Sequence, residues 1–185
     1  MLSEDLAAVP LLLDACAFAT RMHGNQQRKY TGEPYVLHCL EVARTVADVG
    51  GTPTMIAAAL LHDVVEDTAA NIEDVRAAFG DDVAQGVAWL TDVSRPEDGN
   101  RAIRKAIDRA HLAQAPAAMK TVKLADVISN TRSIVEHGDG FARVYLREIS
   151  SLLEVLTEGD PALLRLAQVE VGRGEAKWLG GTIPR

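Results

Sequence analysis

One stretch constrains the fold of this chain more than any other: residues 60–68, which read Leu-Leu-His-Asp-Val-Val-Glu-Asp-Thr. Within six residues the stretch carries four side chains that can bind a metal or transfer protons, namely His62, Asp63, Glu66 and Asp67. The apolar run from Met55 to Leu61 leads directly into it. A solvated charged face is not usually embedded in such a run. The stretch is therefore predicted to form the last turns of a buried helix.

The spacing of these four side chains indicates how they share that helix. Glu66 follows His62 by four residues, and Asp67 follows Asp63 by four, so each pair lies on one ridge, a turn apart. His62 and Asp63 are adjacent and about 100° apart around the axis. They do not face each other, but both can reach a metal ion that other helices hold at that edge.

Composition and periodicity predict an all-α fold. The chain has 185 residues, of which 48% are hydrophobic and only 4% aromatic. This mixture favours closely packed helices over a sheet, and no strand-like alternation persists. We predict a single domain over residues 1–185, with its core at about residues 10–171 and eight or nine helices.

Capping residues and helix breakers indicate where these helices begin and end. Thr52 and Asn71 are expected N-caps, with Asp74 as the acid of a capping box, and residues 94–99 are expected to form a loop. The tail after Gly172 is expected to be loosely held. The expected helices run from Val9 or Pro10 to His23, Pro34 to about Val49, Pro53 through the central stretch, Asn71 to Gly80, Asp82 to Thr91, about Asn100 to Leu112, Pro116 to just before Gly138, Phe141 to Leu156, and Pro161 onward.

Charge and targeting signals exclude several classes of protein. A net charge of −7 argues against a binder of polymeric nucleic acid, although local basic clusters can still hold a small phosphorylated ligand. The N-terminal residues resemble neither a secretory signal nor a membrane span, so we expect a cytoplasmic protein. Cys16 and Cys39 are expected to be buried thiols in a reducing compartment.

Two further polar side chains are predicted to point inward. His38 is followed at four-residue intervals by Val42 and Val46, which face the core, so His38 is expected to face it too. Asp126 is flanked on both sides by apolar residues within a predicted helix, an unfavourable place for a carboxylate that only needs water.

Together these residues indicate a metal site. The imidazoles of His38 and His62 and the carboxylates of Asp63 and Asp126 suit a divalent transition metal. Such an ion lowers the pKa of bound water and polarises a phosphoryl group. Glu66 and Asp67, a turn further along, are candidates to orient or deprotonate that water.

The order of these motifs resembles the HD superfamily of metal-dependent phosphohydrolases. More narrowly, it is similar to the hydrolase domain of the Rel/SpoT proteins and to the small alarmone hydrolases, over about Ala15 to Leu156. The pair Glu66–Asp67 is typical of the hydrolase-active type. The matching segments are residues 27–29 (Gln-Arg-Lys), 32–38 (Gly-Glu-Pro-Tyr-Val-Leu-His), 59–68, 79–80 (Phe-Gly) and 123–126 (Lys-Leu-Ala-Asp) followed by Asn130.

This resemblance implies a role for each residue. One manganese ion would be bound by His38, His62, Asp63 and Asp126, and Glu66 and Asp67 would position or activate the attacking water. Arg28 and Lys29 would contact substrate phosphates, Asn130 the ribose or a phosphate, and Tyr145 the nucleotide. The implied reaction is hydrolysis of the 3′-pyrophosphate of (p)ppGpp or (p)ppApp. The implied partner is a small nucleotide, with neither polymeric nucleic acid nor membrane, and homo-oligomer formation stays open.

The sequence departs from this pattern at points that affect substrate choice. Cys39 replaces the proline that often follows the histidine, and Val127 to Ser129 replace a segment that usually carries Arg and His. One alternative is another nucleotide metallophosphatase, such as an NADPH 2′-phosphatase, and a second is a non-catalytic nucleotide-binding sensor. The basic residues of the sixth helix, Arg101, Arg104, Lys105 and Arg109, are expected to be solvated, with one or two in reach of a 5′-phosphate.

Overall fold

The computed structural model describes residues 2–138 and 140–180, and for residues 2–7 it defines the backbone alone. These described residues form ten α-helices and one short 3-10 helix, with no strand among them. The predicted all-α class is confirmed. None of the helices in this part of the chain combines the length and the apolarity needed to cross a membrane.

Backbone contacts divide the chain into two compact units. The first contains the residues up to 28 and residues 33–91, and the second contains residues 29–32 and those from 92 onward. The segment 29–32 belongs to the second unit, where the Lys29 ammonium lies 5.6 Å from the centroid of the Phe141 ring. The single domain expected for residues 1–185 stays a prediction.

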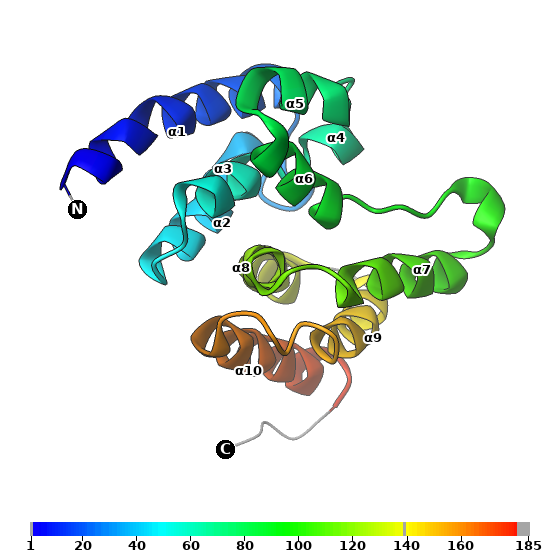
Figure 1. The fold of residues 1–185 in the computed structure, drawn as a ribbon. Helices are drawn as coiled ribbons and strands as arrows, with labels where there is room; N and C mark the ends of the chain where they lie inside the picture. The colour runs from blue at the N-terminus through cyan, green and yellow to red at the C-terminus, as the bar shows by residue number, and fades with distance from the viewer. Residues whose placement is uncertain (1, 139, 181–185) are drawn as a thin grey trace. The chain divides into compact units, whose positions relative to one another are not determined.

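The first unit is organised around the helix α3, which packs against α1, α2 and α6 (Figure 1). Residues 57–61 of α3 are each at most 3% exposed, because their side chains are apolar all around the axis. Of the two cysteines, both free, Cys39 is buried as predicted and Cys16 is half-buried. The helices of this unit are α1 (Leu2–His23), α2 (Val36–Asp48), α3 (Pro53–Leu61), α4 (Val64–Asp67), α5 (Ile72–Phe79) and α6 (Asp81–Leu90).

Local signals in the sequence explain several of these boundaries. The Thr52 hydroxyl accepts a hydrogen bond from the Met55 amide at the start of α3. Asn71 and Asp74 form the predicted reciprocal capping box at the start of α5. Gly80 adopts φ = +84°, a conformation that favours glycine, and so turns the chain from α5 into α6. These three predictions are confirmed.

The helix that carries the central stretch is interrupted, contrary to the prediction. α3 ends at Leu61, His62 is its C-cap, and Asp63 has φ = −97° and ψ = −5° before α4 begins. The His62 Nδ1 lies 2.8 Å from the Ala59 carbonyl oxygen. In a continuous helix the Asp63 amide would use that carbonyl, so the imidazole competes with the backbone where the helix ends. The predicted continuous helix through Asp67 is therefore wrong.

The second unit is built around α8, which packs against α9 and α10 (Figure 1). Val122, Leu124, Val127 and Ile128 on α8 are each at most 1% exposed. The helices of this unit are the 3-10 helix η1 (Pro96–Asp98), α7 (Arg101–Ala113), α8 (Ala117–His137), α9 (Ala142–Leu153) and α10 (Pro161–Trp178).

Three further helix ends differ from the predicted ones by two residues or more. α1 continues through Pro10, so the expected start at Val9 or Pro10 is wrong. α2 starts two residues after Pro34, because Pro34 pairs with Gln27 in an isolated antiparallel bridge. α9 ends at Leu153, three residues before the predicted end.

The predicted loose tail after Gly172 is also wrong for the described residues. α10 continues to Trp178, whose indole N–H donates to the Val135 carbonyl at 3.3 Å. Gly172 and Gly174 are buried, and a Cβ at Gly174 would lie 2.6 Å from a methyl group of Leu146. Because Gly174 has no side chain, Leu146 of α9 can pack close to α10 at this point. A hydrophobicity pattern does not reveal such a contact. Residues 181–185 lie outside the described part of the chain.

The turn before α10 holds the first half of α8 in place. The Asp160 amide donates to the Thr121 hydroxyl at 2.9 Å, and Lys120 forms an ion pair with Glu158. Gly159 lies against the same turn of α8: a Cβ there would be 2.7 Å from Leu124 Cδ1 and 3.1 Å from backbone atoms of residues 120 and 121.

We expect Gly159→Ala to lower the free energy of unfolding by about 1–3 kcal/mol, because the backbone of α8 cannot move aside as a flexible side chain can. Urea unfolding followed by circular dichroism measures the change. Gly140→Ala is the matched control, since its added Cβ meets nothing within 4 Å. Equal midpoints for the two variants would contradict the expected clash.

Candidate functional site

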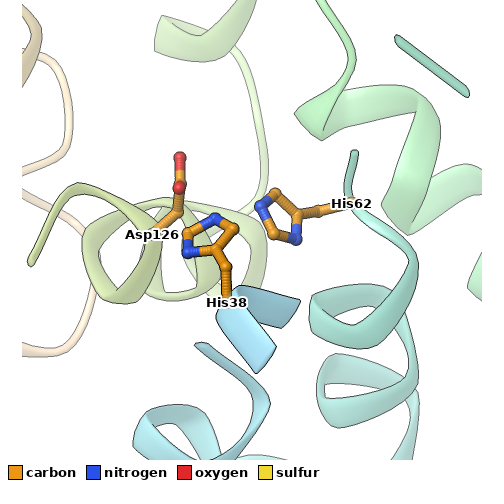
Figure 2. A group of neighbouring side chains, drawn as sticks. All are labelled: His38, His62 and Asp126. Atoms are coloured by element: carbon orange, nitrogen blue, oxygen red, sulfur yellow. The ribbon is translucent and has the colours of Figure 1, made fainter. Parts of the chain in front are cut away.

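Two buried imidazoles form the core of the candidate site in the first unit. His38 projects from α2 and is 1% exposed, and His62 caps α3 and is 2% exposed. Their ring centroids lie 5.2 Å apart with the planes inclined at 65°. Figure 2 draws these neighbouring rings, together with Asp126, which belongs to the second unit.

The Asp63 carboxylate converges on the same two rings. Its Oδ2 lies 3.0 Å from Nε2 of His62 and 3.6 Å from Nε2 of His38. In an uninterrupted helix, adjacent side chains diverge by about 100°. The break after α3 therefore brings Asp63 to the imidazoles. Two nitrogens and one carboxylate oxygen form a donor set that suits a divalent transition metal.

Backbone and side-chain contacts orient these donor atoms. The Ala59 carbonyl can only accept a hydrogen bond, so Nδ1 of His62 carries a proton, and in the neutral imidazole Nε2 presents its lone pair. The Tyr35 hydroxyl donates to Oδ2 of Asp63 at 2.6 Å, and the Tyr35 ring lies 5.5 Å from the ring of His38. Contacts of this kind orient ligands at metal sites. Tyr35 was not predicted, and its only signal is its place in the segment 32–38.

Glu66 and Asp67, the predicted acids, lie on the short helix α4 and are exposed. Oδ2 of Asp67 accepts a hydrogen bond from the Gln26 side chain at 2.9 Å. Both carboxylates thus follow His62 and Asp63 by about one helical turn in the sequence and are exposed to water. An exposed carboxylate can accept a proton from a water molecule.

The two predicted phosphate contacts, Arg28 and Lys29, fall into different units. The Arg28 side chain is only 12% exposed, and its Nη1 lies 3.6 Å from a carboxylate oxygen of Glu41. The Lys29 ammonium lies over the rings of Tyr30 and Phe141 in the second unit. Both cations therefore already have partners within their own unit.

Asp126 is the buried carboxylate of the second unit and is 5% exposed. Lys123, one turn earlier on α8, places Nζ 2.8 Å from Oδ2 of Asp126. Asn130, one turn later, donates from Nδ2 to Oδ1 at 2.6 Å. These contacts hold the carboxylate in one orientation and favour its charged form.

A cavity of about 500 Å³ opens beside Asp126 within the second unit. Its volume lies in the range of small-molecule sites. Asn130 and Tyr145, two predicted substrate contacts, line it, and the Tyr145 hydroxyl lies 3.2 Å from that of Thr131. The walls come from α7, α8 and α9 and include the apolar side chains of Val127, Ile149 and Leu152.

Basic residues of α7 form one wall of this cavity. Arg101, Lys105 and Arg109 line it, so three of the four residues expected on a solvated face border a concave site. Arg101 makes two hydrogen bonds with Glu148, at 2.7 and 2.8 Å, and the contact raises the pKa of the Arg101 guanidinium. Lys105 lies 2.6 Å from Asp92.

Asp108 anchors the loop that leads to this wall. It is 4% exposed, and its carboxylate accepts hydrogen bonds from the amides of Val93 and Ser94 at 3.0 and 2.8 Å and from the Ser94 hydroxyl at 2.9 Å. Sequence reasoning missed this role, because an Asp in a charged helix gives no sign that a distant loop covers it.

Comparisons with known proteins identify the class. A family model described as an HD domain matches residues 15–156, which is more than half of the chain. The chain therefore belongs to the HD domain family.

Individual relatives indicate which members of the HD domain family the chain is similar to. The chain is 40% identical over 134 residues to the probable guanosine-3′,5′-bis(diphosphate) 3′-pyrophosphohydrolase of Synechocystis. The matched region covers 71% of this chain and 18% of that protein. It is 38% identical over 136 residues to the guanosine-3′,5′-bis(diphosphate) 3′-pyrophosphohydrolase MESH1 of Xenopus tropicalis, covering 72% and 73% of the two chains. The chain thus spans about a fifth of the Synechocystis relative and most of the frog protein.

A solved structure agrees with these relatives. A metazoan ortholog of SpoT that hydrolyses ppGpp matches with a TM-score of 0.79 at 28% identity, over 88% of this chain and 94% of that chain. The predicted resemblance to HD-type alarmone hydrolases is confirmed.

The anchoring role of Asp108 can be tested by removing its carboxylate. Asp108→Ala leaves two backbone amides and a hydroxyl without their acceptor, so we expect a loss of about 2–4 kcal/mol in the stability of the loop. Hydrogen exchange of the amides of Val93 and Ser94 should then be faster by at least tenfold. Glu97→Ala, which removes an exposed carboxylate from the same loop, is the control. Unchanged protection in the Asp108 variant would contradict the anchor.

Proposed function

We propose that this protein is a metal-dependent hydrolase that removes the 3′-pyrophosphate of (p)ppGpp, of (p)ppApp, or of both, and releases pyrophosphate and a nucleoside 5′-di- or triphosphate. The observation that carries this proposal is the convergence of His38, His62 and Asp63 in a chain that belongs to the HD domain family. The relatives named above as 3′-pyrophosphohydrolases support the choice of substrate.

The proposed metal ligands are His38, His62 and Asp63 of the first unit and Asp126 of the second. Both histidines and Asp126 are buried, where a carboxylate and neutral imidazoles are costly unless they are paired or bind a metal. Nitrogen and oxygen donors in this proportion fit a divalent ion, and we propose one Mn²⁺. When bound, such an ion polarises a phosphoryl oxygen and lowers the pKa of a coordinated water.

The remaining residues would handle protons and the nucleotide. We assign Glu66 and Asp67 to positioning the attacking water and accepting its proton, because both are exposed carboxylates one turn after the imidazole cluster. The cavity lined by Asn130 and Tyr145 would receive the nucleoside, and Arg28 and Lys29 would contact phosphates.

Two further arginines support a nucleotide in this cavity. Arg109 and Arg147 line it, and their guanidinium groups can donate hydrogen bonds to a phosphate. A cytoplasmic location and homo-oligomer formation stay predictions.

A turnover assay with Mn²⁺ and ppGpp, ppApp and NADPH side by side tests the proposal. We expect pyrophosphate from at least one alarmone, and a fall of at least a thousandfold in kcat/KM for Asp63→Ala and for Asp126→Ala, because each removes a proposed metal ligand. The ratio of the two alarmone rates then gives the base preference. Asp48→Ala, which removes an exposed carboxylate from α2, is the matched control and should keep wild-type activity.

Two other results of this assay would indicate a different function. Orthophosphate from NADPH, with both alarmones intact, would contradict the proposal and favour a nucleotide metallophosphatase on the same scaffold. Tight binding of an alarmone without turnover would instead identify a non-catalytic sensor.

The contact between Tyr35 and Asp63 predicts a measurable effect on metal affinity. Tyr35→Phe removes the hydroxyl that donates to Asp63 at 2.6 Å, so we expect Mn²⁺ to bind about tenfold more weakly. Isothermal titration calorimetry measures this change. Tyr30→Phe removes a hydroxyl on the neighbouring loop and should bind Mn²⁺ like the wild type. Equal affinities for the two variants would show that Tyr35 does not support the ligand.

A further inference from the structure

A line of hydrogen bonds runs from the interior of the first unit to Asp67. Nδ1 of His23 lies 2.8 Å from Oε1 of Gln26, and Nε2 of Gln26 donates to Oδ2 of Asp67 at 2.9 Å. At the inner end, Sγ of Cys39 lies 3.7 Å from Nε2 of His23. His23 is 5% exposed and Cys39 is fully buried, whereas Asp67 faces water. A buried histidine thus connects through one amide to an exposed carboxylate.

The chemistry of the groups sets the direction of this line. An ionised carboxylate only accepts hydrogen bonds, so the Gln26 amide must turn its NH₂ group to Asp67 and its carbonyl oxygen to His23. That oxygen also only accepts, so Nδ1 of His23 carries the proton. In the neutral imidazole Nε2 is then an acceptor, and it faces the weak S–H donor of Cys39. Every donor points toward Asp67.

Backbone hydrogen bonds hold Gln26, and with it the side-chain amide, in place. The backbone N–H of Gln26 donates to the backbone carbonyl of His23 at 2.8 Å, and the backbone carbonyl of Gln26 accepts from the backbone N–H of Tyr35 at 2.9 Å. Both backbone groups of Gln26 are therefore tied, one to the end of α1 and the other to the start of α2. A side chain that starts from a fixed backbone loses less conformational entropy when it holds a partner.

His23 also contacts the residue that orients the proposed metal ligand. Its ring lies 4.8 Å from the ring of Tyr35, with the planes inclined at 33°, and the Tyr35 hydroxyl donates to Asp63. The buried His23 imidazole is thus linked to Asp67 through Gln26 and to Asp63 through Tyr35.

We propose that His23 and Gln26 are positioning residues that hold the Asp67 carboxylate in the orientation needed to accept a proton from the attacking water. This inference rests on the proposed hydrolytic function and on the role assigned to Asp67. Asp67 ends a helix of four residues and is exposed, so its side chain would otherwise sample several rotamers. The Gln26 side chain donates to its Oδ2, and the residue is otherwise exposed. A fixed orientation contributes to rate rather than to substrate binding.

Substitutions along the line test this inference. Gln26→Leu should lower kcat about tenfold, with KM and Mn²⁺ affinity close to the wild type, because one charge-assisted hydrogen bond is lost. His23→Leu should lower kcat by a similar factor, because the hydrogen bond that holds the Gln26 side chain is lost. His23→Asn, which keeps an amide N–H near the position of Nδ1, should retain most of the activity. Gln27→Leu, at the exposed neighbouring glutamine, is the control for the loop.

A double-mutant cycle separates positioning from general damage. In an Asp67→Asn background, Gln26→Leu should cause no further fall in kcat, because residues that act through one group are not additive. An equal tenfold fall in both backgrounds would overturn the inference. If the wild type cleaves another phosphate ester and no alarmone, the proposed substrate is wrong, and the same cycle measured on that ester still decides whether Gln26 acts through Asp67.

A spectroscopic measurement needs no substrate. Long-range ¹⁵N–¹H correlation spectra of ¹⁵N-histidine-labelled protein should show neutral His23 with its proton on Nδ1, and Gln26→Leu should shift it toward a mixture of tautomers. A wild-type His23 with its proton on Nε2 would break the line at its first link and overturn the inference. This result also decides the matter if Asp67→Asn leaves no measurable turnover.

Discussion

The hydrogen bond between the His62 ring and the Ala59 carbonyl is the contact on which the site in the first unit depends. It takes a carbonyl that a longer helix would use, so α3 ends at Leu61 and the chain bends at Asp63. The same bond fixes the tautomer of the neutral His62 ring, in which Nε2 presents its lone pair next to the Asp63 carboxylate. One interaction therefore ends a helix, orients an imidazole and brings an adjacent carboxylate beside it.

Buried residues within each unit support the polar groups of that unit. In the first unit the apolar surface of α3 and the contacts of Tyr35, His23 and Gln26 leave the proposed ligands and Asp67 little freedom. In the second unit α8 packs against α9 and α10, and Lys123 and Asn130 hold Asp126 between them. In each unit, packing and hydrogen bonding thus hold the polar side chains in fixed orientations. Such preorganisation is what a site for phosphoryl chemistry requires.

Much of the fold and part of the site could be predicted from local patterns. The all-α class, the capping box of Asn71 and Asp74, and the inward direction of His38 and Asp126 follow from spacing and from the cost of burying polar groups. Two predictions failed where a contact between segments outweighed a local signal. Pro34 pairs with Gln27 instead of starting a helix, and α10 continues past Gly172 because its glycines meet α8 and α9.

The sequence by itself determined which residues have chemistry to offer, because helical spacing and an apolar context are properties of the chain alone. It placed His38, His62, Asp63 and Asp126 inward and Glu66 and Asp67 a turn beyond. Only the tertiary structure decided how these groups are held. Tyr35 behind Asp63, Gln26 behind Asp67 and Asp108 beneath its loop act through hydrogen bonds between segments 14 to 41 residues apart. No local pattern encodes such contacts, since they exist only after the helices have packed.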